Sequence, residues 1–272
     1  MKKQLLLLGA AAILCTSCIF LPPKEEVEIL RKDDLILVWS DEFNYSGVPD
    51  TSKWKYQTGH GDKGWGNNEL QNYIDNTKEA KTAVVENGVL KIKAYQENGE
   101  WKSARMNSKQ SWKYGYFEAR MKITDRKGAW PAFWMMPQDS VYGGWPDSGE
   151  IDIMENAPAT CGNHKIFSSL HARGHYEANP KSIGAKVYDG KLSSEWHKVG
   201  ILWTKEKITA YYDDVAVGTY ENNGSGYIDW PYDQNFYIIL NLAIGGNLGG
   251  SGYVNELGGN AEFQIDYVRV YQ

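Results

Sequence analysis

The chain has 272 residues, of which 42% are hydrophobic and 23% are charged, a balance typical of a globular protein. This length is enough for one large all-β domain or two ordinary domains. The formal net charge is −5 and no long Lys/Arg run is present, so we do not expect a nucleic-acid partner. Trp (11) and Tyr (18) outnumber Phe (7), which favours carbohydrate-stacking surfaces, although large β-sandwiches are also rich in aromatic residues.

The N-terminus has the pattern of a secretion signal. Two lysines precede an apolar run at residues 5–14, which is too short to span a bilayer but suits a signal-peptide core. The small residues before Cys18 resemble a bacterial lipoprotein signal, in which that cysteine becomes residue one and carries lipid. We therefore expect a lipoprotein signal peptide over 1–17 and a tether over 18–34, with an ordinary cleaved signal peptide as the alternative. This predicts a bacterial cell-envelope protein, lipid-anchored at the outer membrane or cell surface.

Cysteine usage agrees with this prediction. Of the three cysteines, Cys15 is removed with the signal peptide and Cys18 carries lipid, so Cys161 has no partner for an internal disulfide. The domain expected over 35–272 must then rest on its core alone, and a chain of this size buries roughly 70–75% of its surface.

Segments of alternating hydrophobicity recur along 35–272, between frequent Gly, Asn, Asp and Pro. In FEARMKI (117–123), apolar residues alternate with charged ones, which predicts a strand with one buried and one wet face. Further strands are predicted at 197–203, 208–212, 215–220, 236–242 and 263–272. Asp213 and Asp214 would form a hairpin turn, and the strand at 236–242 would be covered on both faces. With no long helical period and no repeat, we expect an all-β, two-sheet antiparallel sandwich in one domain.

The segment WPDSGEIDIMEN (145–156) carries the most chemistry. On a strand, its first two isoleucines would lie on one face, and Glu150 and Asp152 on the other. Strict alternation would place Glu155 in the core at high cost. A β-bulge near Met154 would return Glu155 to the face of the other two acids, and bulges are common beside active sites.

Like charges this close repel each other, so folding alone does not favour them. Carboxylate clusters bind Ca²⁺, and pairs of acids also hydrolyse glycosides. In that reaction one acid attacks the anomeric carbon while another protonates the leaving oxygen. Asp152, between the two glutamates, would modulate the pKa of both. The simpler alternative is a solvated, acid-rich edge strand.

SGEIDIMEN, with its E-x-D-x-x-E spacing, resembles glycoside hydrolase family 16, and in particular its laminarinase-like branch. Further matching segments follow in order: LVWSDEFN (37–44), KWKYQTG (53–59), WGNNELQNY (65–73), SARM (103–106), YGYFEARMKI (114–123), WPAFWMMP (130–137), LH (170–171), WPYDQNFYIILNLAIGGN (230–247) and IDYVRVYQ (265–272). The resemblance implies a concanavalin-like β-jelly-roll sandwich with a substrate cleft across one sheet. It also implies a retaining double displacement, with Glu150 as nucleophile, Glu155 as general acid/base and Asp152 as electrostatic helper. Met154 places the chain on the laminarinase side, because lichenase-type members have the shorter E-x-D-x-E spacing.

The activity implied by the resemblance is endo-hydrolysis of β-1,3-glucan, of mixed-linkage β-1,3-1,4-glucan, or of both, with no cofactor for the chemistry. The substrate-binding residues that we expect are Asn68, Arg105, Trp130, Trp145 and His171. The tryptophans would stack on sugar rings, and Asn68 and Arg105 would hydrogen-bond hydroxyl groups. The alternatives are core packing for the tryptophans, turn formation for Asn68 and a surface salt bridge for Arg105. His171 matches a histidine on the strand beside the catalytic one, within reach of the central acid.

Many members of this family carry a structural Ca²⁺, and Asp266 occupies the matching position, with backbone oxygens near Glu42. One carboxylate supplies few of the six to eight oxygens that such a site needs. The histidines are scattered without metal-ligand spacing, which excludes a zinc site. Three alternatives stay open: a non-catalytic β-glucan-binding protein, a Ca²⁺-dependent lectin, and a different polysaccharide specificity on the same fold. We expect a monomer that binds β-glucan and contacts a membrane only through its lipid anchor.

Overall fold

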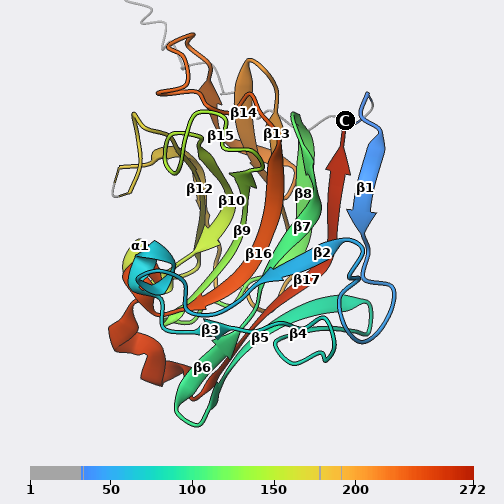
Figure 1. The fold of residues 1–272 in the computed structure, drawn as a ribbon, viewed down its shortest axis with the longest axis vertical. Coiled ribbons are helices and arrows are strands. Elements are labelled where there is room, and N and C mark those ends of the chain that lie inside the picture. Colours follow the sequence, from blue (N-terminus) through green and yellow to red (C-terminus); the bar gives the residue numbers. More distant parts are fainter. Residues whose placement is uncertain (1–31, 33, 178, 191) are drawn as a thin grey trace, which may run out of the picture.

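The computed structural model describes residues 32, 34–177, 179–190 and 192–272, which form two sheets lying face to face (Figure 1). The ten-stranded sheet contains β1 Leu37–Asp41, β3 Asn72–Tyr73, β4 Ala83–Glu86, β5 Val89–Glu97, β6 Glu100–Ser103, β8 Gly115–Lys122, β13 His197–Trp203, β14 Lys207–Tyr212, β15 Val215–Glu221 and β17 Asn260–Tyr271. The seven-stranded sheet contains β2 Trp54–Gln57, β7 Arg105–Trp112, β9 Ala129–Pro137, β10 Glu150–Asn156, β11 Lys165–His171, β12 Lys181–Val187 and β16 Phe236–Ile244. The predicted all-β, two-sheet sandwich is confirmed.

The order of strands in the seven-stranded sheet is β12-β11-β10-β9-β16-β7-β2, so the acid-bearing β10 lies inside the sheet and not at its edge. The solvated edge-strand alternative is therefore wrong. The helical segments are short: η1 Gly64–Asn68, α1 Pro158–Cys161, α2 Gly246–Gly249 and η2 Ser251–Leu257. Among the described residues, no helix has the length and apolar character needed to cross a membrane. The expected signal peptide, Cys18 and most of the tether lie outside the described residues.

The alternation of FEARMKI places β8 in the core, with one correction. Phe117, Ala119 and Met121 are fully buried, as predicted for the apolar face. The opposite face is not uniformly wet, because Glu118 is also fully buried. Its carboxylate accepts hydrogen bonds from the Tyr116 and Tyr267 hydroxyls, each at 3.0 Å, and from Lys32, which makes burial of this charge tolerable. Charge alone therefore did not predict exposure.

The expected hairpin forms between β14 and β15. Its turn residues Asp213 and Asp214 have φ values of 52° and 67°, the left-handed conformation that a tight two-residue hairpin turn requires. The Asp213 carboxylate also accepts hydrogen bonds from the Lys198 backbone N–H at 3.0 Å and the Tyr188 hydroxyl at 2.9 Å. The turn is therefore fixed from outside as well as by its own conformation.

β16 is buried on both faces, as its apolar sequence predicts, because it lies between β9 and β7 in the middle of its sheet. Phe236, Ile238 and Leu240 belong to the hydrophobic cluster that joins the two sheets. The alternate residues face outward, and Asn241 among them lies opposite Ala132 of β9 and Arg105 of β7. The outward face of the seven-stranded sheet thus rests on a rigid, fully packed layer.

Candidate active site

A β-bulge in β10 brings the three predicted acids onto one face of the strand. Against β9, Asp152 pairs with Trp134 but Met154 pairs with Phe133, so the register shifts by one residue between them. Against β11, the shift falls between Asp152 and Glu155. Met154 is fully buried in the core. Asp152 and Glu155 lie on the other face, where the Ser169 hydroxyl of β11 donates to both. The bulge predicted near Met154 is confirmed.

Asp152 lies at the centre of the acid strip and is 3% exposed. Its Oδ2 accepts a hydrogen bond from Ser169 Oγ at 2.8 Å and lies 3.0 Å from His171 Nε2. His171 lies on β11, where it pairs with Glu150 of β10. Its contact with Asp152 confirms the expected contact between this histidine and the central acid. Ser169 was not predicted, although it lies two residues before His171 and strand alternation therefore puts both on one face.

Each glutamate of the strip accepts a hydrogen bond from a tryptophan. Trp130 Nε1 donates to Glu155 Oε1 at 2.9 Å, and Trp145 Nε1 donates to Glu150 Oε2 at 2.6 Å. Trp130 is 8% exposed, so it is buried and holds the acid with its N–H. Trp145 is 45% exposed and keeps a ring surface available for stacking.

The pKa values of the strip are set by burial and by mutual repulsion. Burial raises the pKa of Glu150 and of Glu155, and the charge on Asp152 raises both further. Burial alone would lower the pKa of His171, but the hydrogen bond and the charge of Asp152 outweigh it and raise that pKa to about 9. The His171 imidazole therefore lies beside Asp152 within the strip. Because the pKa values of both glutamates are raised, either of them can carry a proton, as a proton donor requires.

Arg105 lies in β7, which is separated from the acid-bearing β10 by two strands, β9 and β16. Its guanidinium lies between the rings of Trp65 and Trp134, 4.5 Å and 4.6 Å from their centroids, and Nε donates to Gln57 Oε1 at 2.6 Å. Arg105 is only 8% exposed, so the surface salt-bridge alternative is wrong. A guanidinium fixed by two aromatic rings and by Gln57 is a preorganised donor for hydroxyl groups.

Asn68 and its neighbour Glu69 lie at the end of η1. Asn68 has a φ of 57°, and its exposed side chain donates to Asn247 Oδ1 at 2.9 Å, so its turn-forming role is present. Glu69 was not predicted as a site residue. It is 8% exposed, accepts hydrogen bonds from Gln71 and Tyr73, and burial raises its pKa. The sugar contacts of Asn68, Arg105, Trp130, Trp145 and His171 stay predictions.

The calcium site expected at Asp266, with backbone oxygens near Glu42, lies in a region where arginines pair with both acidic side chains. Asp266 Oδ2 pairs with Arg120 Nη1 at 2.7 Å, and both carboxylate oxygens of Glu42 accept hydrogen bonds from Arg269, at 2.9 and 2.7 Å. The Arg120 guanidinium therefore engages one of the two carboxylate oxygens of Asp266, whereas the Glu42 carboxylate was not an expected ligand. The calcium ligand at Asp266 stays a prediction.

The acid strip itself also does not have the composition of a calcium site. Ligand atoms of Glu150, Asp152 and His171 lie within 4.8 Å of one another. Ca²⁺ prefers oxygen ligands only, whereas this group includes an imidazole whose Nε2 already contacts Asp152. The acid strip therefore does not support a Ca²⁺-dependent lectin.

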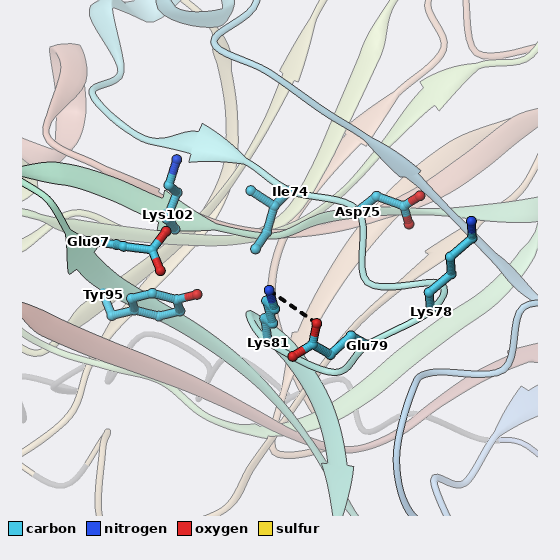
Figure 2. A pocket seen from close by; sticks show the side chains of 8 residues that line it. All are labelled: Ile74, Asp75, Lys78, Glu79, Lys81, Tyr95, Glu97 and Lys102. Carbon is cyan, nitrogen blue, oxygen red and sulfur yellow. Dashed lines mark ion pairs between the residues drawn. The ribbon is translucent and has the colours of Figure 1, made fainter.

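A separate hollow of about 340 Å³ lies by the loop between β3 and β4 (Figure 2). It is lined by Ile74, Asp75, Lys78, Glu79, Lys81, Tyr95, Glu97 and Lys102. The charges are mixed, and Lys81 pairs with Glu79 at 3.1 Å. None of the acids of β10 lines it, so this hollow is separate from the candidate active site.

Comparison with known proteins gives consistent matches over most of the chain. Residues 70–269 match the family described as Glycosyl hydrolases family 16. A glucan endo-1,3-beta-glucosidase of Cryptopygus antarcticus is 39% identical over 259 residues, which cover 86% of this chain and 91% of that protein. The laminarinase structure from Rhodothermus marinus has a TM-score of 0.80 at 36% identity, covering 88% of this chain and 97% of its own. SCLam, a non-specific endo-beta-1,3(4)-glucanase, has a TM-score of 0.80 at 35% identity, covering 90% and 94%.

Proposed function

Because the chain belongs to glycosyl hydrolases family 16 and is a glycoside hydrolase, we propose that it cleaves β-1,3-glucan and mixed-linkage β-1,3-1,4-glucan inside the polymer. The observation that carries this proposal is the bulged strip of Glu150, Asp152 and Glu155, in which two glutamates with raised pKa values flank one aspartate. Similarity to a glucan endo-1,3-beta-glucosidase and to a non-specific endo-beta-1,3(4)-glucanase supports both linkages.

The strip performs a double displacement with retention. The ionised Glu150 carboxylate attacks the anomeric carbon, the bond to the leaving oxygen breaks, and Glu155 gives its proton to that oxygen. Forming the ester removes the negative charge of Glu150, so the pKa of Glu155 falls. Glu155 then takes a proton from water, which attacks the anomeric carbon and releases Glu150. Glu155 supplies the proton for the leaving oxygen and is protonated again by water. The chemistry therefore needs no cofactor.

The test is incubation of the purified protein with laminarin, barley mixed-linkage glucan, lichenan and xyloglucan, with Glu150→Gln as the matched control. Chromatography over time should show intermediate oligosaccharides first from one or more of the three β-1,3-containing polymers, and none with the variant. Proton NMR of the first products should show the β-anomer, as retention requires. Binding without any product would favour the non-catalytic glucan-binding alternative, and products from xyloglucan alone would favour a different specificity.

We also propose that the chain is secreted and anchored through a lipid on Cys18, at the outer membrane or cell surface, as a monomer. The support is the signal pattern of residues 1–17 and the charged, proline-containing segment that follows. Mass spectrometry of the native N-terminus should find a diacylated or triacylated cysteine. Recovery of the native protein only from the soluble periplasm would contradict the anchor.

A further inference from the structure

Trp145 donates a hydrogen bond to Glu150 although its own side chain lies on a loop and is only partly buried. It lies in the irregular segment between β9 and β10, its side chain is 45% exposed, and its Nε1 donates to Glu150 Oε2 at 2.6 Å. A half-exposed indole on a loop keeps such a bond only if its neighbours restrict its rotation. The residues that pack against Trp145 therefore bear on the catalytic carboxylate.

Tyr176, in the connection between β11 and β12, packs against Trp145. The two ring centroids are 5.7 Å apart at an interplanar angle of 90°, an edge-to-face contact. Trp145 also contacts His171, whose ring centroid lies 6.1 Å from that of Trp145. Trp145 thus packs against two rings: that of His171, which contacts Asp152, and that of Tyr176.

The turn that carries Tyr176 is firmly held. Ala172 and His175 exchange two backbone hydrogen bonds, each of 2.9 Å, across the turn. The two ring nitrogens of His175 lie 3.1 Å from the Leu170 carbonyl oxygen and 3.2 Å from that of Asp229. Tyr176 therefore follows directly on a turn that is tied to β11 and to the loop before β16.

A second contact joins the same turn to the Trp145 loop. Arg173 Nε lies 2.9 Å from Asp147 Oδ1, two residues after Trp145. Arg173 is exposed, so this ion pair alone contributes little. Together with the ring contact, it gives the turn two contacts with the loop that carries Trp145.

From these contacts we infer that Tyr176, assisted by Arg173, is a positioning residue that acts through Trp145 to keep the indole N–H on the Glu150 carboxylate. The inference rests on the proposed role of Glu150 as nucleophile. An N–H donor stabilises the ionised carboxylate, so its loss raises the pKa of Glu150. Since the nucleophile must be ionised, the acidic limb of kcat/KM then moves to higher pH.

The experiment is a double-mutant cycle of Tyr176→Ala and Trp145→Phe, measured as the pH profile of kcat/KM on the best β-glucan. Trp145→Phe should lower kcat/KM about tenfold and move the acidic limb up by about one pH unit. Tyr176→Ala should lower kcat/KM about threefold and move the acidic limb up by about half a pH unit. The effect is smaller because the hydrogen bond from Trp145 to Glu150 is weakened and not removed. In the Trp145→Phe background, Tyr176→Ala should have no further effect. Tyr176→Phe keeps the ring edge and should behave as wild type.

Tyr227→Ala is the matched control. Tyr227 is 38% exposed against 39% for Tyr176, but it stacks on Tyr142, with centroids 4.9 Å apart, and not on Trp145. Its removal should leave the acidic limb in place. Additive effects of Tyr176→Ala and Trp145→Phe, or a fall in kcat/KM with an unchanged acidic limb, would overturn the inference and indicate direct substrate binding by Tyr176.

A second readout separates this inference from the proposed function. Carbon-13 NMR of protein labelled at the glutamate carboxyl carbons, assigned with Glu150→Gln, follows the titration of Glu150 without any substrate. Tyr176→Ala should raise the midpoint and Tyr227→Ala should not. If the wild type hydrolyses no β-glucan but this midpoint still rises, the proposed function fails and the positioning role stands. An unchanged midpoint overturns the positioning role even in an active enzyme.

Discussion

Trp130→Phe tests whether the buried indole sets the proton affinity of Glu155, the proposed general acid. Trp130 Nε1 donates to Glu155 Oε1 at 2.9 Å, and the two side chains are 8% and 7% exposed, so solvent cannot replace the lost bond. A hydrogen bond to a charged acceptor contributes roughly 1.5–3 kcal/mol. At about 1.4 kcal/mol per pKa unit, its loss should raise the pKa of Glu155 by roughly one to two units.

The sign of the effect on activity follows from the role of Glu155 in the first step. Glu155 must be protonated to donate to the leaving oxygen, so a higher pKa moves the basic limb of kcat/KM to higher pH by the same roughly one to two units. The assay is initial hydrolysis rate at low substrate concentration across the pH range. Trp134→Phe is the control, because Trp134 shares the strand face but donates to Asn241 and not to an acid. A basic limb that stays in place, or moves equally in both variants, would refute the reasoning.

Three further outcomes follow from the contacts of the site. His171→Gln removes the positive charge that lowers the pKa of Glu150 and Glu155, so the acidic limb of kcat/KM should move up by about one unit, and an unmoved limb would argue that His171 is neutral in the enzyme. Gly149→Ala should destabilise the fold by about 2 kcal/mol or more and lower the melting temperature by several degrees, because Gly149 has a φ of +83° and a Cβ there would lie 2.8 Å from the Pro231 ring. Gly144→Ala, which meets open space, should be near neutral in the same calorimetric measurement. Prolonged EDTA treatment should leave the hydrolysis rate unchanged, and a loss restored by Ca²⁺ would revive a metal-dependent site.

The position of the acids could be predicted because strand alternation and the cost of burying a charge make opposite demands on Glu155. Alternation places Glu155 in the core, the cost of burying a charge forbids it, and a bulge satisfies both. The structure has that bulge, with Met154 in the core in place of the glutamate. Alternation predicted β8, a continuous apolar run predicted β16, and the Asp213-Asp214 turn predicted the hairpin of β14 and β15, because these patterns are local and need no knowledge of the partner strand.

The partners of the acids could not be predicted by this route. Trp130 and Trp145 are separated from the acids they contact by 25 and 5 residues, and which ring nitrogen meets which carboxylate depends on strand order and loop path. The stacking of Arg105 between Trp65 and Trp134 likewise needs β7, β9 and η1 to come together. Aromatic side chains give the same sequence signal whether they stack on a sugar, on a guanidinium or in the core. Their roles follow only from the fold.

Buried acid side chains alone do not define the active site, as Glu118 and Glu155 demonstrate together. Both are buried, at 0% and 7% exposure. Two tyrosine hydroxyls and the ammonium of Lys32 donate hydrogen bonds to Glu118, so this buried carboxylate is well satisfied where it lies. Burial and the charge on Asp152 raise the pKa of Glu155, while the Trp130 indole, the charge of His171 and the Ser169 hydroxyl lower it. In the proposed mechanism, a carboxylate with such opposing neighbours changes its protonation state when the charge of Glu150 disappears in the ester. The proposed chemistry of the strip therefore rests on acids whose neighbours oppose one another, whereas two hydroxyls and one ammonium hold Glu118 in a structural role.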